Sequence, residues 1–130
     1  MPESARLTHT AAVLLVRDLR AAAEHYRDRM GFTIGTLFGE PPTFTIVNRD
    51  DQYVMLKQIA DPERIVPHKS VAPGLWDLYF WVEDVDALHE ELAGRGANIE
   101  YGLCDQAYGC REFAVLDLDG HSVGFGQIID

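Results

Sequence analysis

Apolar residues along this chain follow two spacings, and the two spacings occur in the same order twice. Short stretches in which apolar and polar residues alternate indicate β-strands, whereas apolar residues three or four positions apart indicate an amphipathic helix. In each half one strand comes first, a helix follows, and three more strands complete the unit. The predicted strands of the first half are residues 8–16, 33–38, 43–48 and 52–59, and those of the second are residues 76–82, 98–103, 111–116 and 121–128. The pattern therefore predicts a βαβββ unit that occurs twice.

The two predicted helices have clear start and stop signals. Asp18 and Asp84 come directly before the helices, where an aspartate side chain accepts the free N–H groups of a first turn. Gly31 and Gly96 follow the helices and allow the chain to turn away. The apolar stripes consist of Leu19, Ala22, Ala23, Tyr26 and Met30 in the first helix and of Val85, Leu88 and Leu92 in the second.

The repeat sets the expected domain organisation. A chain of 130 residues is long enough for one compact domain, and we assign residues 1–130 to it. Its two units are expected to span about residues 7–59 and 75–129, with residues 60–74 as the connector. The element order predicts an α+β fold in which two tandem βαβββ units form curved mixed sheets around a cleft.

Alternation along the strands separates a helix-facing side of each sheet from an open side. The helix-facing residues are expected to be Ala12, Leu14, Val16, Val54, Leu56, Leu78, Phe80, Val82, Val123 and Phe125. The open side is expected to carry His9, Ala11, Val13, Leu15, Tyr53, Met55, Lys57, Asp77, Tyr79, Trp81, Ser122, Gly124 and Gly126. Aromatic rings next to glycines leave a hollow the size of a planar group, which indicates a ligand site. Packing of Tyr79 and Trp81 in a core or a dimer interface is the alternative.

The charge and composition of the chain limit which classes of binding partner are expected. The formal charge of −10 repels nucleic acid and would mildly favour a cationic ligand, although we favour simple solubility as its explanation. No apolar run is long enough to cross a membrane and the first residues lack a signal-peptide core, so we expect a cytoplasmic protein without a membrane partner. Cys104 and Cys110 are expected to be reduced thiols in a loop. We expect His121 to be a turn residue, and His25 and His89 to be solvated on the helices.

Sequence motifs resemble a known family. V-x-D-L (residues 16–19) and V-x-D-V (residues 82–85) open the helices, and D-x-D-G (residues 117–120) stands near the end. Together with the doubled βαβββ order, these motifs resemble the vicinal oxygen chelate superfamily of glyoxalases, extradiol dioxygenases and bleomycin resistance proteins. GLWDLYFWVEDVDALHEEL and YGCREFAVLDLDGHSVGF are most similar to the bleomycin resistance branch, whose members sequester a drug without changing it. The resemblance implies a homodimer in which units pair to close each cleft.

Metal-bearing members of that superfamily take ligands from the first and last strands of each unit. When the repeats are aligned, Ala11 corresponds to Asp77 and Met55 to Gly124. Of these four, only Asp77 offers an oxygen ligand, whereas three or four protein ligands are normal. We therefore expect no metal and no cofactor. A shift of one pleat would bring His9 beside Asp77, and this is the alternative.

Three functions stay open. We favour a metal-independent protein that sequesters a planar or cationic small molecule, because aromatic rings stack on flat ligands and acidic residues attract cations. The second is a metal-independent lyase or isomerase that uses Asp77 as a general base, assisted by His9, Tyr79 or Lys57. The third is a metal-dependent glyoxalase or dioxygenase. The expected ligand-binding residues are Trp81, Tyr79, Asp77, Tyr53, Met55, Phe38, Trp76, Tyr108 and Gly124.

Overall fold

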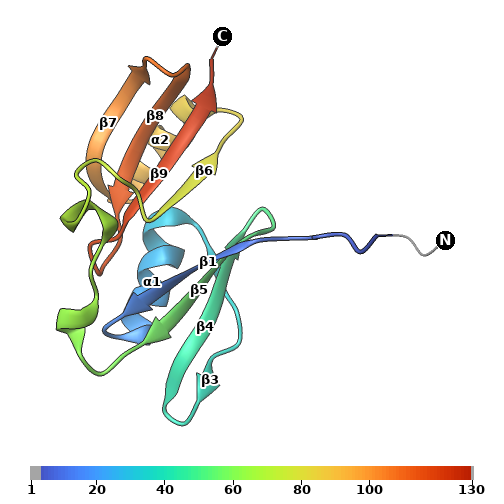
Figure 1. Ribbon diagram of the computed structural model, residues 1–130, viewed down its shortest axis with the longest axis vertical. Helices are drawn as coiled ribbons and strands as arrows, with labels where there is room; N and C mark the ends of the chain where they lie inside the picture. Colours follow the sequence, from blue (N-terminus) through green and yellow to red (C-terminus); the bar gives the residue numbers. More distant parts are fainter. Residues whose placement is uncertain (1–3, 130) are drawn as a thin grey trace.

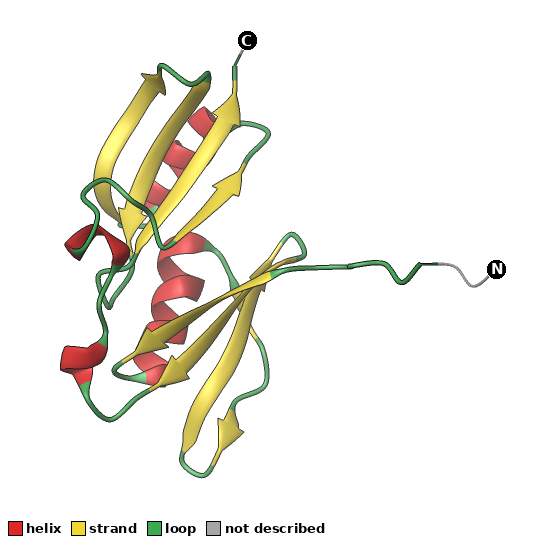
Figure 2. Cartoon of the chain, in the orientation of Figure 1, coloured by secondary structure: helices red, strands yellow, loops and turns green. Residues whose placement is uncertain are grey.

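Two βαβββ units follow one another in the computed structural model, which describes residues 4–129. In the view of Figure 1 the strands of both units lie in front of the helices, so that both sheets present an open face to the same side. Figure 2 shows each sheet with a helix behind it. The predicted α+β fold with two curved mixed sheets is confirmed.

The first unit has its strands in the order β1-β5-β4-β2, with β3 also paired to β4. Its β1 runs parallel to β5, and the other pairs are antiparallel. The elements are β1 (Ala11–Val16), α1 (Leu19–Met30), β2 (Thr33–Ile34), β3 (Phe38–Gly39), β4 (Pro42–Arg49) and β5 (Gln52–Gln58). Residues 4–10 precede β1 as an exposed extended segment that points away from the body of the protein (Figure 1).

The second unit repeats this arrangement with the order β6-β9-β8-β7, in which β6 runs parallel to β9. Its elements are β6 (Leu78–Trp81), α2 (Val85–Gly94), β7 (Asn98–Gln106), β8 (Cys110–Leu116) and β9 (Ser122–Ile128). The connector between the units contains two short 3₁₀ turns, Pro62–Arg64 and His68–Ser70.

The predicted helix signals act as expected. The Asp18 carboxylate accepts the backbone N–H of Ala21, and the Asp84 carboxylate accepts that of Ala87, each at 3.1 Å. Gly31 ends α1 in the left-handed conformation, with φ of 74°. The second helix ends at Gly94, two residues before the predicted stop.

Some predicted strand limits are wrong. The first strand begins at Ala11 because residues 8–10 pair with no other strand, and the segment expected at 33–38 is divided into β2 and β3. Cys104 and Cys110 lie on the adjacent strands β7 and β8, since a tight turn with Gly109 at φ of 86° replaces the expected loop. Both thiols are free, as predicted.

One hydrophobic core joins the two units. Leu14, Val16, Val54 and Leu56 of the first sheet are buried, and Val123 and Phe125 of the second are buried as well. These predicted helix-facing residues pack with both helices into a single cluster. The rings of Phe80, Phe113 and Phe125 stack in a row, with centroid distances of 5.5 and 5.2 Å.

Polar contacts also fasten the units together. The buried Tyr26 hydroxyl of α1 donates to Asp117 at 2.8 Å. His121 lies in the turn between β8 and β9, as predicted, and also donates through Nε2–H to the Leu15 carbonyl at 2.8 Å, with only 5% of its surface exposed. Arg49 makes a bidentate ion pair with Glu91 at 2.8 and 3.0 Å.

The helix histidines are less solvated than predicted. Burial lowers the pKa of His25, which packs beside the end of β8. His89 lies edge-on to Phe113 with ring centroids 5.0 Å apart. None of the helices within residues 4–129 combines the length and the apolar character needed to cross a membrane.

Replacing Tyr26 by Phe is expected to destabilise the protein by about 1–3 kcal/mol, because the ring keeps its packing while buried Asp117 loses a donor. Urea unfolding measures this difference. Tyr53→Phe, at a partly exposed position of the open face, serves as the matched control and should change the free energy of unfolding by less than about 0.5 kcal/mol. Equal stabilities of Tyr26→Phe and the unmodified protein would contradict a fastening role for this bond.

Candidate functional site

Four aromatic side chains gather on the open face of the second sheet. Tyr79 comes from β6, Tyr101 from β7, Tyr108 from the turn between β7 and β8, and Trp76 from the segment before β6. We call these four residues the aromatic layer. Trp76 packs edge-on against Tyr79 with ring centroids 4.6 Å apart, and its indole N–H donates to the Tyr101 hydroxyl at 2.8 Å. Segments that are distant along the chain thus build one surface.

The aromatic layer covers a carboxylate without exposed surface. Glu112 lies on β8 and is 0% exposed. Its Oε1 accepts the hydroxyl protons of Tyr108 at 2.6 Å and Tyr79 at 3.0 Å. Its Oε2 accepts the Tyr101 hydroxyl at 2.6 Å and the Gln106 amide at 3.4 Å. A buried carboxylate is tolerated only with such donors, so Glu112 and the phenols hold one another in place.

Two glycines of β9 make room for the ring of Tyr79. A Cβ atom at Gly124 would lie 2.6 Å from Tyr79 Cδ2 and 2.8 Å from Trp76 Cδ1, and one at Gly126 would overlap the Tyr79 hydroxyl. The prediction of a ligand-sized hollow beside these glycines is wrong, because the rings of Tyr79 and Trp76 fill it. Gly124 is buried beneath them and supports the surface from below.

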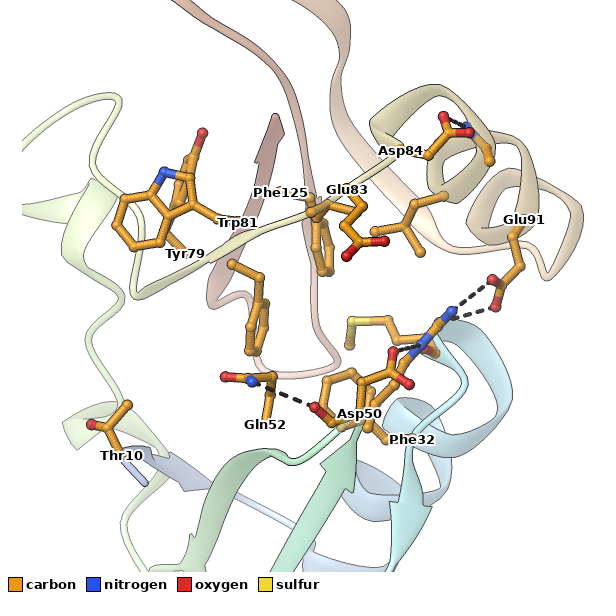
Figure 3. Close-up of a pocket in the computed structure, with 16 residues that line it drawn as sticks. Thr10, Phe32, Asp50, Gln52, Tyr79, Trp81, Glu83, Asp84, Glu91 and Phe125 are labelled. Carbon is orange, nitrogen blue, oxygen red and sulfur yellow. Dashed lines mark hydrogen bonds and ion pairs between the residues drawn. The ribbon is translucent and has the colours of Figure 1, made fainter. Parts of the chain in front are cut away.

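A hollow of about 920 Å³ lies between the two units, and we call it the crease (Figure 3). Trp81 and Tyr79 lie together on one side of it, with ring centroids 5.4 Å apart. Trp81 lines the crease and contacts Tyr79 of the aromatic layer, so it connects the two surfaces. Its side chain is 71% exposed. The lining combines apolar and acidic side chains, among them Phe32, Phe80, Phe125, Asp50 and Glu83.

The centre of the open face of the first sheet is apolar and partly exposed. Val13 on β1 is paired with Met55 on β5, which is paired with Ile46 on β4, so that three apolar side chains lie side by side. Val13 is 61% exposed. This face differs from that of the second sheet, because no buried carboxylate organises it.

The structure divides the predicted binding residues between these surfaces. Trp81, Tyr79, Trp76 and Tyr108 come together at the second sheet. Three others lie on the first sheet: Tyr53 contacts His9, Phe38 packs against Phe44, and Met55 belongs to the apolar row.

Asp77 has both carboxylate oxygens occupied. Its Oδ1 accepts the backbone N–H of His68 at 3.0 Å, and its Oδ2 accepts that of Ser122 at 2.8 Å. The side chain is 4% exposed and ties the connector to the start of β9. A general base needs a free oxygen within reach of the substrate, so this geometry suits Asp77 to a structural role.

The positions that the resemblance assigns to metal ligands do not fit a metal. Ala11 and Gly124 have no donor side chain, Met55 offers a thioether, and the oxygens of Asp77 are already bonded. His9, the alternative ligand, contacts a ring of β5 instead. Within residues 4–129 no three His, Cys, Asp or Glu residues are grouped so that they could hold a metal ion.

Glu112, Tyr101 and Gln106 belong to the surface although the sequence analysis does not identify them. Alternation along β8 puts Glu112 on the same side as Ala114, and the register places it opposite Gly126. On the side of β8 that faces away from the helix, Glu112 is the charged residue among Cys110, Ala114 and Leu116, and this is the signal that identifies it.

The three phenols of the aromatic layer remain protonated well above neutral pH. Burial raises the pKa of Tyr79, Tyr101 and Tyr108 above the ordinary value, and the hydrogen bonds to Glu112 raise it further. For Tyr79 a contact with the Cys110 thiol adds to the increase. A phenolate here would place a second negative charge against Glu112.

Alkaline titration is expected to unfold the protein together with tyrosine ionisation. Because the folded pKa values of these tyrosines are raised, the folded protein keeps protons that the unfolded chain releases above about pH 10. Their contribution to stability is complete below that pH and is lost as the pH rises. Phenolate absorbance and circular dichroism should change in one step. Ionisation of most of the five tyrosines in a protein that keeps its circular dichroism would contradict this arrangement.

Comparison with known proteins places this geometry in a family. The profile of the Glyoxalase/Bleomycin resistance protein/Dioxygenase superfamily matches residues 6–125. The fold is similar to that of the bleomycin-binding protein from bleomycin-producing Streptomyces verticillus, solved in complex with copper(II)-bleomycin. The two chains share 27% identity with a TM-score of 0.70 over 94% of this chain and 97% of that one.

Two further solved structures are similar to this chain. TnmS3, an antibiotic binding protein from Streptomyces sp. CB03234, is 22% identical with a TM-score of 0.70, over 97% of this chain and 99% of that one. TioX from Micromonospora sp. ML1 is 23% identical with a TM-score of 0.73, over 94% and 99% respectively. No curated protein sequence matches the chain. On the match over residues 6–125, this chain belongs to the Glyoxalase/Bleomycin resistance protein/Dioxygenase superfamily.

Proposed function

We propose that this protein binds and sequesters a planar small molecule of the antibiotic type, without a metal, on the aromatic layer and the adjoining Trp81. The observation that carries the proposal is the aromatic layer itself, in which hydrogen bonds to a buried carboxylate hold the rings in place. Rings that are already ordered lose little conformational freedom when a flat ligand stacks on them, which favours binding.

The chemistry of the layer favours binding over catalysis. Both oxygens of Glu112 accept two hydrogen bonds each, so neither is free to take a proton from a ligand. The raised pKa values of the phenols make them poor proton donors near neutral pH. Membership of a superfamily that includes bleomycin resistance proteins, and 27% identity to a bleomycin-binding protein, support the same reading.

A large ligand has room to extend from the layer into the crease. Tyr108 is 62% exposed at one end of the surface and Trp81 is 71% exposed at the other, beside the crease. Asp50 and Glu83 stand on opposite sides of that hollow (Figure 3); Asp50 is paired with Arg49 at 3.6 Å, whereas Glu83 is in none of the ion pairs found within residues 4–129. The ligand would therefore stack on the rings with one part and enter the crease with another.

We also infer that the protein acts as a homodimer. The row formed by Val13, Met55 and Ile46 is a partly exposed apolar face, with Val13 61% exposed, and such faces mark association sites. A second copy brings an aromatic layer of its own, so a two-fold arrangement can place the first sheet of one chain over the second sheet of the other. Each ligand would then be enclosed by both protomers.

Fluorescence titration tests the binding proposal, because the two tryptophans lie at different places on the surface. Bleomycin, with and without copper(II), and a set of planar three-ring compounds are added to the protein. We expect at least one compound to change the emission and to be recovered chemically unchanged. In Trp81→Phe the remaining signal comes from Trp76, and in Trp76→Phe it comes from Trp81, so the pair locates the ligand.

Trp81→Ala is expected to weaken binding by about tenfold, because stacking on an exposed indole contributes about 1–1.5 kcal/mol. Val71→Ala, at a connector position that is 78% exposed, is the control and should bind as the unmodified protein does. Absence of binding across the whole set, or equal affinities for Trp81→Ala and the unmodified protein, would exclude this function at this surface.

The dimer is tested by a matched pair of charge substitutions. Val13→Lys places a charge in the apolar row, whereas Val71→Lys places the same charge on the connector, and both valines are exposed in the single chain. Light scattering coupled to size exclusion should give twice the mass of one chain for the unmodified protein and for Val71→Lys. Val13→Lys should elute as a monomer. A monomeric unmodified protein, or a dimeric Val13→Lys, argues against this interface.

A further inference from the structure

We propose that Glu112 determines the charge and hydrogen-bonding character of the ligand, so that the aromatic layer selects planar compounds with a positive charge or N–H donors and rejects anionic ones. This inference rests on the proposed function, since it concerns the ligand of the same surface. It follows from the direction of the hydrogen bonds beneath the rings.

Each phenol has a single proton and donates it to the carboxylate; the Tyr79 hydroxyl also lies 3.6 Å from the sulfur of the buried Cys110, so neither acceptor leaves its proton for a ligand. The Trp76 indole N–H is also used, because it donates to the Tyr101 oxygen. The four residues of the aromatic layer therefore offer a ligand no donor of their own, and the adjoining Trp81 adds a single indole N–H at the edge of the crease. What remains available is the lone pairs of phenolic oxygens, which accept hydrogen bonds, and the negative faces of the rings.

The charge of Glu112 is balanced by dipoles and not by a cation. Its partners are three hydroxyls and one amide, and among the ion pairs of residues 4–129 none includes it. Neutral dipoles hold the charge without cancelling it at a distance, so the surface above the rings carries a negative potential. A planar cation stacked there gains from this potential as well as from the ring faces.

The ligand reaches this potential through the rings and not through the carboxylate. Glu112 is fully buried, whereas Tyr108 is 62% exposed. A ligand therefore contacts ring faces and phenolic oxygens, and Glu112 acts on it as a positioning residue that orients the phenols and supplies the charge. The rings select a ligand by its size and flatness, and the carboxylate below them selects it by its charge.

Three probes of similar size separate polarity from shape: proflavine, a three-ring cation; acridone, a neutral three-ring compound with one N–H donor; and anthracene-9-carboxylate, a three-ring anion. Calorimetric titration of the unmodified protein should give about tenfold tighter binding for the cation than for acridone, and weaker binding again for the anion. Equal affinities for the three probes, or tightest binding of the anion, would overturn the inference.

Glu112→Gln tests the residue directly, because it keeps the shape and removes the charge. The affinity ratio between the cation and the anion should fall by about tenfold or more. Glu90→Gln makes the same chemical change on the exposed surface of α2, behind the sheet, and should leave the ratio unchanged. A general loosening of the layer would weaken all probes together, so the ratio distinguishes selectivity from structural damage.

Tyr108→Phe keeps the inference testable if Glu112→Gln does not fold. It removes one donor from Glu112 at an exposed position and leaves the charge in place. The ratio between cation and anion should then stay at least as high as in the unmodified protein. Loss of the preference in this variant would show that the hydroxyl, and not the carboxylate, sets it.

The two proposals fail in different ways. If neither bleomycin nor any three-ring probe binds the unmodified protein, the proposed function fails, and the inference about Glu112 fails with it. If probes bind at the tryptophans without regard to their charge, the proposed function stands and the role of Glu112 is refuted.

Discussion

One buried carboxylate, Glu112, needs hydrogen-bond donors, and this need determines how the aromatic layer is arranged. Glu112 has no exposed area, and an unpartnered carboxylate in that position would cost several kcal/mol. Its donors come from β6, from β7 and from the turn between β7 and β8, so the pairing of the whole second sheet is a condition for satisfying it. The glycines of β9 are part of the same condition, because a side chain at Gly126 would displace the Tyr79 hydroxyl from the carboxylate. The hydrogen bonds to Glu112 thus require one strand register, one orientation of the rings, and glycine at position 126.

The two βαβββ units share one architecture but differ in the open face of their sheets. Both copies bury one side of their sheet against a helix, and the apolar residues of both contribute to a common core. Their open sides differ: the first presents the apolar row of Val13, Met55 and Ile46, and the second presents hydroxyls and rings above Glu112. A surface with an apolar centre is suited to covering another surface, whereas one with ordered rings is suited to recognising a ligand. The asymmetry is consistent with the proposed two-fold pairing, in which the first sheet of each copy would lie over the second sheet of the other.

Most of the fold can be predicted from hydrophobic periodicity and helix-capping residues, because both depend on residues that are close together along the chain. The order of elements, the aspartate caps and the helix-facing side of each sheet are all local in this sense. The contacts that build the surface are not local. Alternation places Tyr79 next to glycines, but whether a ring or a ligand fills the space depends on how Tyr79 leans across β9 toward Glu112, 33 residues away. Strand alternation predicts which face a side chain occupies, and only the paired strands determine its direction on that face.

Asp77 is a carboxylate at a position suited to metal binding, but the structure gives it a different set of contacts. It stands where the resemblance would place a metal ligand, yet its two oxygens accept the backbone N–H groups of His68 and Ser122. These bonds hold the connector against β9, so the carboxylate is needed for the path of the chain between the units. A change to histidine would therefore leave two backbone donors without their acceptor and would still supply one ligand among partners that cannot coordinate, Ala11 and Gly124. A single substitution at Asp77 therefore does not assemble a metal site, because the other aligned positions would still lack donor side chains.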